Sequence, residues 1–209
     1  DKYADVTIAP AFARIEMEGL ATAATSQITA YKLEGIFLNN MYNGLKLDGT
    51  ADGTKQTNGT TVANYAQGVS GGTPEYKVVE NGILHQWLST SASGTPLEVA
   101  PAAGMRWAFQ VVPNNANNGN DQLQIVLRLS GVAATGFTFS GDQYITVRGF
   151  KDNAGKIVTI DPGKIYTISK ADFNFTENNL NPVPVVQAVG VYLKVTVTPW
   201  SVVSVKPNI

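Results

Sequence analysis

Few residues in this sequence are of the types that carry out chemistry, and their spacing indicates no catalytic or metal site. The chain has one histidine, His85, and no cysteine. The absence of cysteine excludes disulfide bonds, thiolate zinc sites, iron–sulfur clusters and thiol catalysis. His85 falls in the apolar stretch 82–87, with no nucleophile or second ligand at a recognisable spacing. We therefore interpret it as a structural residue and predict no catalytic residue, metal or cofactor.

The spacing of the carboxylates weakly suggests two kinds of site, a calcium loop and a pair of catalytic carboxylates. Asp48 and Asp52 resemble part of a calcium loop, but the twelfth position is Gly59, where an EF-hand has glutamate. Two Asp-Gly turns account for this segment better. Glu16 and Glu18 would share one strand face, and glycoside hydrolysis needs two carboxylates in one cleft. Because both could simply face solvent, an enzyme remains only a third hypothesis.

The tryptophans raise the alternative of a surface that stacks against sugars. The three are Trp87, Trp107 and Trp200. Trp107 alternates with Phe109 and Val111, which is the pattern of side chains that face a core. We expect Trp107 to be buried. A carbohydrate-binding, lectin-like β-sandwich is therefore the second functional hypothesis, and it predicts an exposed aromatic platform.

The charge of the chain disfavours nucleic acid as a partner. Only 15% of the 209 residues are charged and the formal net charge is -1, whereas a nucleic-acid binder needs a basic patch. No apolar run reaches the roughly 18 residues of a membrane-spanning helix. The first residue is Asp1 and no secretion signal precedes it, so we expect a mature product or a fragment.

Any site must be positioned by β-strands, because apolar residues recur mainly with a period of two. We expect the segment 11–20 to be a strand rather than a short helix, with Ala13, Ile15 and Met17 on one face. Gly35 should weaken a regular ladder in its strand, through either a bulge or a close approach of another backbone. The other predicted strands lie in 28–39, 107–111, 122–129, 144–150 and 191–198.

Turn signals separate these strands. Residues 151–156 should join two strands as a hairpin, and residues 161–164 form a tight turn in which proline precedes glycine. Long polar loops are expected over 48–72 and 114–121. Helical signal is limited to a turn or two at 61–67 and 169–173. The sequence therefore predicts an all-β antiparallel sandwich with one domain over 1–209.

The C-terminal segment 188–209 is the most distinctive feature of the sequence. From Val191 to Thr198, apolar and polar residues alternate, which predicts one strand with one buried face. Pro199 then interrupts the backbone hydrogen bonding before a second apolar run. Such a strand either completes its own sheet or pairs with the open edge of another chain.

Blocks along most of the chain, taken in order, resemble a known family. They are 13–16, 28–40, 106–113, 144–150, 163–168 and 194–200. In order and spacing they resemble the fimbrillins, the major and minor pilin subunits of Bacteroidales fimbriae, also called type V pili. The match is to the C-terminal domain of a family whose members usually carry two domains. The lipobox cysteine of the family is absent from this sequence.

The resemblance implies a transthyretin-like, Greek-key sandwich that is exported across the outer membrane to the cell surface. It implies other pilin subunits as partners, in a homopolymer or heteropolymer, with ligands on host or bacterial surfaces as further partners. In the family an N-terminal strand is removed after a basic residue, but Arg14 lies in a predicted core strand, which argues against cleavage there. A neighbouring subunit's strand fills the resulting groove. The donor residues carried over are Val191, Leu193, Val195, Val197, Trp200, Val202, Val203 and Val205.

Overall fold

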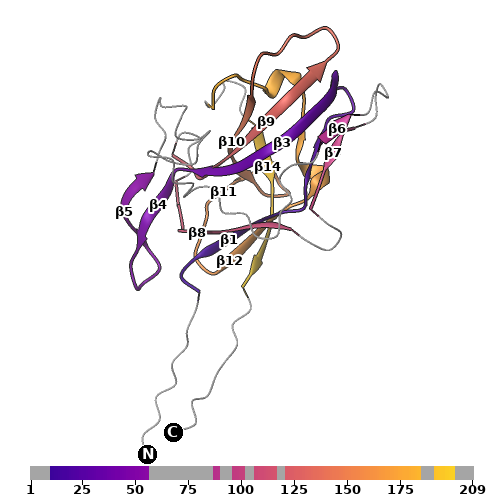
Figure 1. Ribbon diagram of the computed structural model, residues 1–209. Helices are drawn as coiled ribbons and strands as arrows, with labels where there is room; N and C mark the ends of the chain where they lie inside the picture. Colours follow the sequence, from indigo (N-terminus) through magenta and orange to yellow (C-terminus); the bar gives the residue numbers. More distant parts are fainter. Residues whose placement is uncertain are drawn as a thin grey trace, which may run out of the picture.

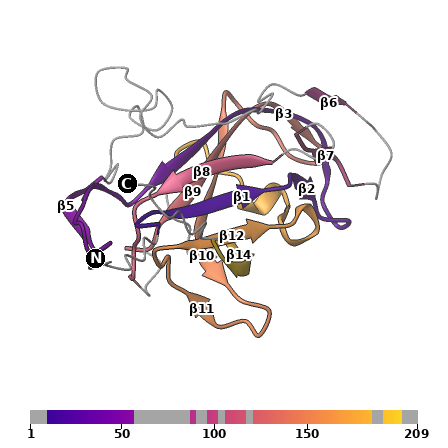
Figure 2. The same cartoon turned by 90° about the horizontal axis from the view of Figure 1, so that it is seen from below.

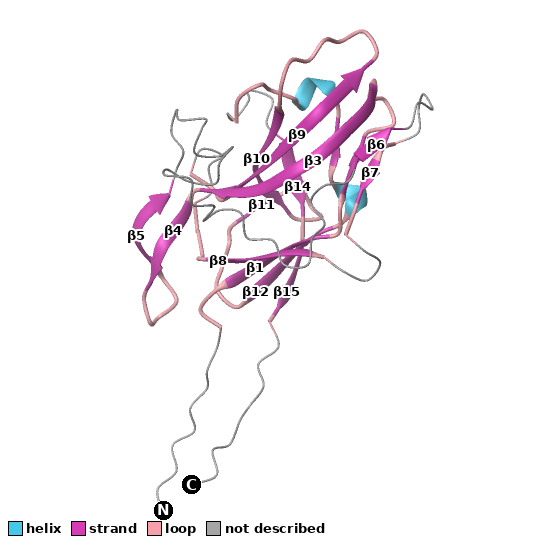
Figure 3. Cartoon of the chain, viewed as in Figure 1, coloured by secondary structure: helices cyan, strands magenta, loops and turns pink. Residues whose placement is uncertain are grey.

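The computed structural model describes residues 10–56, 87–89, 96–101, 106–116, 121–184 and 191–200. Within these ranges every regular element is a β-strand except two single-turn 3-10 helices (Figures 1 and 3). The predicted all-β class is therefore confirmed. His85, the helical turn predicted at 61–67, and the donor residues Val202, Val203 and Val205 lie outside the described residues.

One layer of the fold is a four-stranded sheet with the order β15-β12-β1-β8. Its central strand β1 runs parallel to β12 and antiparallel to β8. The strands are β1 (Ala13–Met17), β8 (Trp107–Val111), β12 (Lys164–Ile168) and β15 (Thr196–Pro199). We call this layer the short sheet.

The facing layer is a larger sheet with the order β11-β10-β9-β3-β6, and β14 also pairs with β10. We call it the long sheet, and Figure 2 shows it behind the short sheet. Its strands are β3 (Ile28–Asn39), β6 (Trp87–Ser89), β9 (Gln124–Ala134), β10 (Gln143–Lys151), β11 (Ile157–Val158) and β14 (Val191–Lys194).

Smaller elements complete the described fold. The strands β2 (Leu20–Thr22), β7 (Glu98–Val99) and β13 (Asn174–Phe175) form a three-stranded sheet. A separate hairpin consists of β4 (Met41–Leu45) and β5 (Ala51–Gln56). The 3-10 helices are η1 (Lys170–Asp172) and η2 (Glu177–Asn179), of which η1 matches the turn predicted at 169–173.

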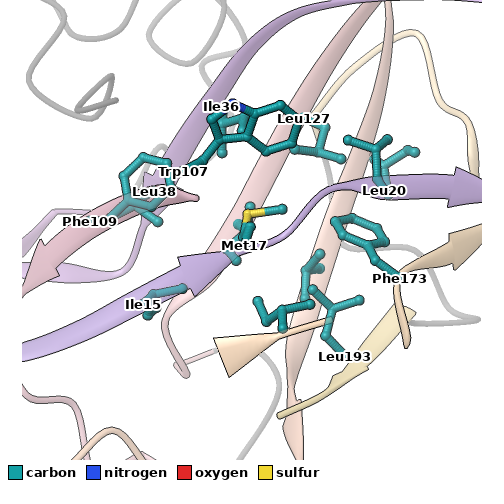
Figure 4. Close-up of a cluster of buried hydrophobic side chains, with 14 of the residues drawn as sticks. Ile15, Met17, Leu20, Ile36, Leu38, Trp107, Phe109, Leu127, Phe173 and Leu193 are labelled. Atoms are coloured by element: carbon teal, nitrogen blue, oxygen red, sulfur yellow. The ribbon is translucent and has the colours of Figure 1, made fainter. Parts of the chain in front are cut away.

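The core lies between the two layers and draws apolar side chains from both. Trp107, Phe109 and Ile15 of the short sheet are fully buried, as are Ile36 and Leu127 of the long sheet. They belong to one continuous hydrophobic cluster, part of which Figure 4 shows. The predicted alternation in β1 and β8 is confirmed, because it is the inward-facing residues that are buried.

Several local predictions are confirmed. β3 has the predicted bounds, and its pairing with β9 shifts register between Leu33 and Gly35. β10 and β11 form the predicted hairpin. Gly163 of the predicted tight turn has φ +66°, a value that L side chains rarely adopt.

The sheets are mostly antiparallel, as predicted, but they also contain three parallel strand pairs that the sequence did not indicate. They are β1 with β12, β10 with β14, and β13 with β2. Each parallel pair joins strands far apart in the sequence. Short-range alternation and turn signals predict hairpins, and they carry no information on such distant pairings.

The Phe37 ring lies close to Gly35 on the same strand, β3, which leads to the first prediction. A Cβ at this position would lie 2.8 Å from two carbons of the Phe37 ring, and Phe37 is only 3% exposed. We expect Gly35→Ala to lower the free energy of unfolding by about 1–3 kcal/mol, as overpacking does. Urea denaturation measures the effect.

The matching control is a double-mutant cycle with Phe37→Leu, which removes part of the ring from the path of the new methyl group. The double variant should lose less stability than the sum of the two single variants. If the losses of stability in the two single variants simply add up in the double variant, the Phe37 ring is not what destabilises Gly35→Ala.

Candidate functional site

The C-terminal segment folds as two strands in different sheets, not as the single strand that the alternation predicts. β14 pairs parallel to β10 in the long sheet, whereas β15 pairs antiparallel to β12 in the short sheet. Val195 lies between them, and its N–H donates to the Lys151 carbonyl at 2.9 Å. The interruption therefore falls at Val195, and Pro199 is instead the last residue of β15.

This change of sheet divides the predicted donor residues into two groups. Leu193 and Val195 are 1% and 2% exposed and belong to the core, but Val197 is 40% exposed. The buried face predicted for the strand 191–198 is therefore wrong at Val197, because the chain leaves one layer and enters the other at Val195. Trp200 is half-buried, and the side chain of Val191 is outside what the structure describes.

β14 is anchored to the long sheet by contacts on both of its faces. Leu193 points into the core near Phe173 (Figure 4). On the other face, the Lys151 ammonium lies 4.3 Å from the centroid of the Tyr192 ring, a cation–π contact. β14 therefore belongs to the folded body of the domain.

β15 is held much more loosely. All four of its residues are exposed, and β12 is its only neighbour in the order of the short sheet over the described residues. The Trp200 N–H donates to the Gly163 carbonyl at 2.9 Å. In an antiparallel pair, the backbone groups of successive residues point alternately toward the partner strand and away from it. Because Trp200 points toward β12, Thr196 and Thr198 do so as well, whereas Val197 and Pro199 point toward the free edge. Proline is tolerated at such an edge because it has no N–H to leave unpaired.

Both described ends of the sandwich meet at one turn. Gly163 donates its N–H to the Phe12 carbonyl at 2.9 Å and accepts from Trp200 at the same distance. The chain therefore enters β1 and leaves β15 at the same end of the molecule (Figure 1). A strand that leaves at this end can be displaced without threading through the core.

The outer face of the short sheet carries a polar hollow of about 480 Å³. Arg106 is its central charge: one guanidinium nitrogen lies 2.7 Å from Glu16 and the other 2.8 Å from Glu18. Arg14 binds the second oxygen of Glu16 at 2.8 Å. The lining residues are Glu16, Glu18, Arg106, Ile165, Thr167, Ser169, Thr196 and Thr198.

The electrostatics of this hollow keep Glu16 ionised. Desolvation by itself raises the pKa of Glu16, but the hydrogen bonds and charges of Arg14 and Arg106 outweigh it and hold the pKa below its ordinary value of 4.5. A glycosidase needs one carboxylic acid with a raised pKa as its proton donor. Glu16 does not fit that role, because its lowered pKa keeps it as an ionised carboxylate.

The lowered pKa predicts a dependence of stability on pH. Because the folded-state pKa of Glu16 lies below the unfolded value of 4.5, its contribution is complete above about pH 5 and disappears as the pH falls through the folded pKa. Glu16→Gln should therefore show a shallower loss of stability below pH 5 than the native chain. Urea midpoints between about pH 3 and about pH 7 test this, and parallel pH curves for both proteins would contradict it.

The other sequence candidates do not converge on a site. Asp48 accepts the Thr50 N–H at 2.9 Å and the Thr50 hydroxyl at 2.7 Å, which is a local turn as expected. In the described ranges, no group of three His, Cys, Asp or Glu residues is placed to hold a metal. No helix in that part of the chain is long and apolar enough to span a membrane. The full burial of Trp107 removes it from any aromatic platform, and the side chain of Trp87 is outside the described set.

Sequence reasoning missed most of the hollow. The pair Glu16 and Glu18 was a visible signal, because a spacing of two on a strand places both on one face. The contribution of Arg106 was not visible, since it enters the site from a segment some ninety residues away. Thr196 and Thr198 join it only because β15 pairs beside β12.

Comparison with known proteins gives a distant structural likeness only. No protein-family model and no curated protein matches the chain. A candidate cell adhesion protein from Parabacteroides distasonis superposes with a TM-score of 0.41 at 12% identity, over 95% of this chain and 54% of that one. Another, from Bacteroides eggerthii, gives 0.38 at 13% identity, over 92% and 56%. This chain spans just over half the length of either protein.

Proposed function

We propose that the chain is a cell-surface fimbrial subunit of the fimbrillin type that polymerises by β-strand exchange. In this proposal residues 1–209 form a single domain and 188–209 contain the donor strand. The observation that carries it is the unequal attachment of the C-terminal segment. β14 is anchored by buried side chains, whereas β15 is an exposed edge strand beside the exit of the chain.

Strand exchange needs a strand that can leave one copy and pair with another at little cost in buried surface. β15 meets this requirement, because none of its residues is buried and its attachment to the short sheet is through β12. The position next to β12 would then receive β15 of a neighbouring copy, through the same backbone hydrogen bonds. Leu193 and Val195 keep the donor attached to its own domain.

Two proline variants test this proposal. Thr198→Pro removes an N–H that faces β12 and should abolish assembly of the purified chain, as seen by light scattering and electron microscopy. Val197→Pro removes an N–H at the free edge and should leave assembly intact. The reverse pattern, with only Val197→Pro defective, would show that copies join through the free edge of β15 and not by exchange.

A further inference from the structure

The hollow on the outer face of the short sheet has unused hydrogen-bonding capacity. The hydroxyls of Thr167, Thr196 and Thr198 face it, and none of them hydrogen-bonds within the part of the chain that the structure describes. Thr167 and Thr196 are register partners on neighbouring strands, so these groups lie side by side. Each hydroxyl can donate one hydrogen bond and accept two.

The charged side of the hollow is fixed in place by ion pairs. Arg106 bridges the two carboxylates and orients them, and Glu18 keeps one carboxylate oxygen without a protein partner in the described structure. Glu16 and Glu18 are balanced by Arg106 in the lining and by Arg14 beside it, so the cluster carries no net charge. Anions such as phosphate, sulfate or a sialic acid are therefore disfavoured, because the only lining cation is already paired twice.

The size and chemistry of the hollow favour one class of ligand. The hollow of about 480 Å³ is open and not enclosed, so it suits a ligand that lies along the surface and stays partly in water. A peptide strand would pair with a sheet edge, whereas this hollow lies on the face of the sheet and is lined by side chains of β1, β12 and β15. A neutral oligosaccharide has many hydroxyls, which can hydrogen-bond to the threonine hydroxyls and to the carboxylate of Glu18. The apolar face of a sugar ring can cover Ile165. We propose that the hollow binds a neutral oligosaccharide.

The proposal does not depend on polymerisation. The residues outside the donor segment include Glu16 of β1, Glu18 just after β1, Thr167 of β12 and Arg106 just before β8. β15 supplies only Thr196 and Thr198. Side-chain variants outside the donor segment therefore change the hollow and keep the backbone groups through which β12 and β15 pair.

The test begins with the purified native chain on an array of neutral, sialylated and sulfated oligosaccharides. The expected result is binding to neutral oligosaccharides, with the strongest one taken into isothermal titration calorimetry. The double variant Thr167→Val, Glu18→Gln should bind it at least tenfold more weakly, because it removes a hydroxyl and a charged acceptor. Thr138→Val, which changes an exposed hydroxyl between β9 and β10, should bind like the native chain.

Mapping by NMR on the native chain provides a readout that does not depend on how well a variant folds. Addition of the oligosaccharide should shift the backbone signals of Thr167, Glu18 and Arg106. The proposal is overturned if no neutral oligosaccharide binds, if only acidic ones bind, or if the shifted signals lie away from the hollow. It is equally overturned if the folded double variant binds with native affinity.

Discussion

Deletion of residues 196–209 is expected to abolish assembly while the rest of the domain stays folded. The deletion removes β15, whose four residues are exposed, and keeps Leu193 and Val195, which are buried in the core. Loss of a short exposed edge strand removes little apolar contact, so the thermal transition of the truncated chain should remain cooperative. Assembly is scored by electron microscopy of the purified chain, or of cells that produce and export it.

The position of the cut matters for this experiment. A deletion that starts at Val191 would also remove Leu193 and Val195 from the core, and a loss of assembly could then come from unfolding alone. A cut before Thr196 separates the two effects. Polymers of normal length from a folded chain that lacks 196–209 would refute the role of the C-terminal segment.

Leu193→Ala is expected to lower the free energy of unfolding by about 2–5 kcal/mol, as truncation of a buried leucine does. Leu193 is 1% exposed and belongs to the main hydrophobic cluster, so the substitution leaves a cavity between the layers. Val197→Ala in the adjacent strand is the matched control. Because Val197 is 40% exposed, its loss should cost about 1 kcal/mol or less.

Denaturation by urea compares the two variants directly. Equal losses for Leu193→Ala and Val197→Ala would contradict the division of the C-terminal segment into an anchored and a loosely held strand. The same comparison tests the assembly proposal, since only an anchored β14 can keep a donated β15 joined to its own domain.

The sequence predicted the local elements well because their signals are local. Alternation identified β1, β3 and β8, and glycine and proline identified the turn at Gly163. The bulge at Gly35 was visible because a glycine inside a strand pattern usually marks one. In each case a few neighbouring residues determine the backbone geometry.

What the sequence could not predict depends on pairings across long distances. The parallel neighbours β1 and β12 are separated by most of the chain, and no turn signal links them. The alternation from Val191 to Val197 suggested one strand, but tertiary packing splits it at Val195 because two different sheet edges are available. The hollow was missed for the same reason, since its residues meet only after the short sheet has formed.

The most direct test of strand exchange uses the absence of cysteine from the chain. Ile165 and Thr198 are register partners on β12 and β15, and paired positions of an antiparallel ladder lie within the reach of a disulfide. One preparation carries only Ile165→Cys and another only Thr198→Cys. The two are mixed, assembled and oxidised, and the product is separated without reductant. We predict disulfide-linked pairs that contain one chain of each kind and that form only in assembled material. Assembled polymers without such mixed pairs, alongside efficient bridging within a single chain that carries both cysteines, would contradict exchange of β15.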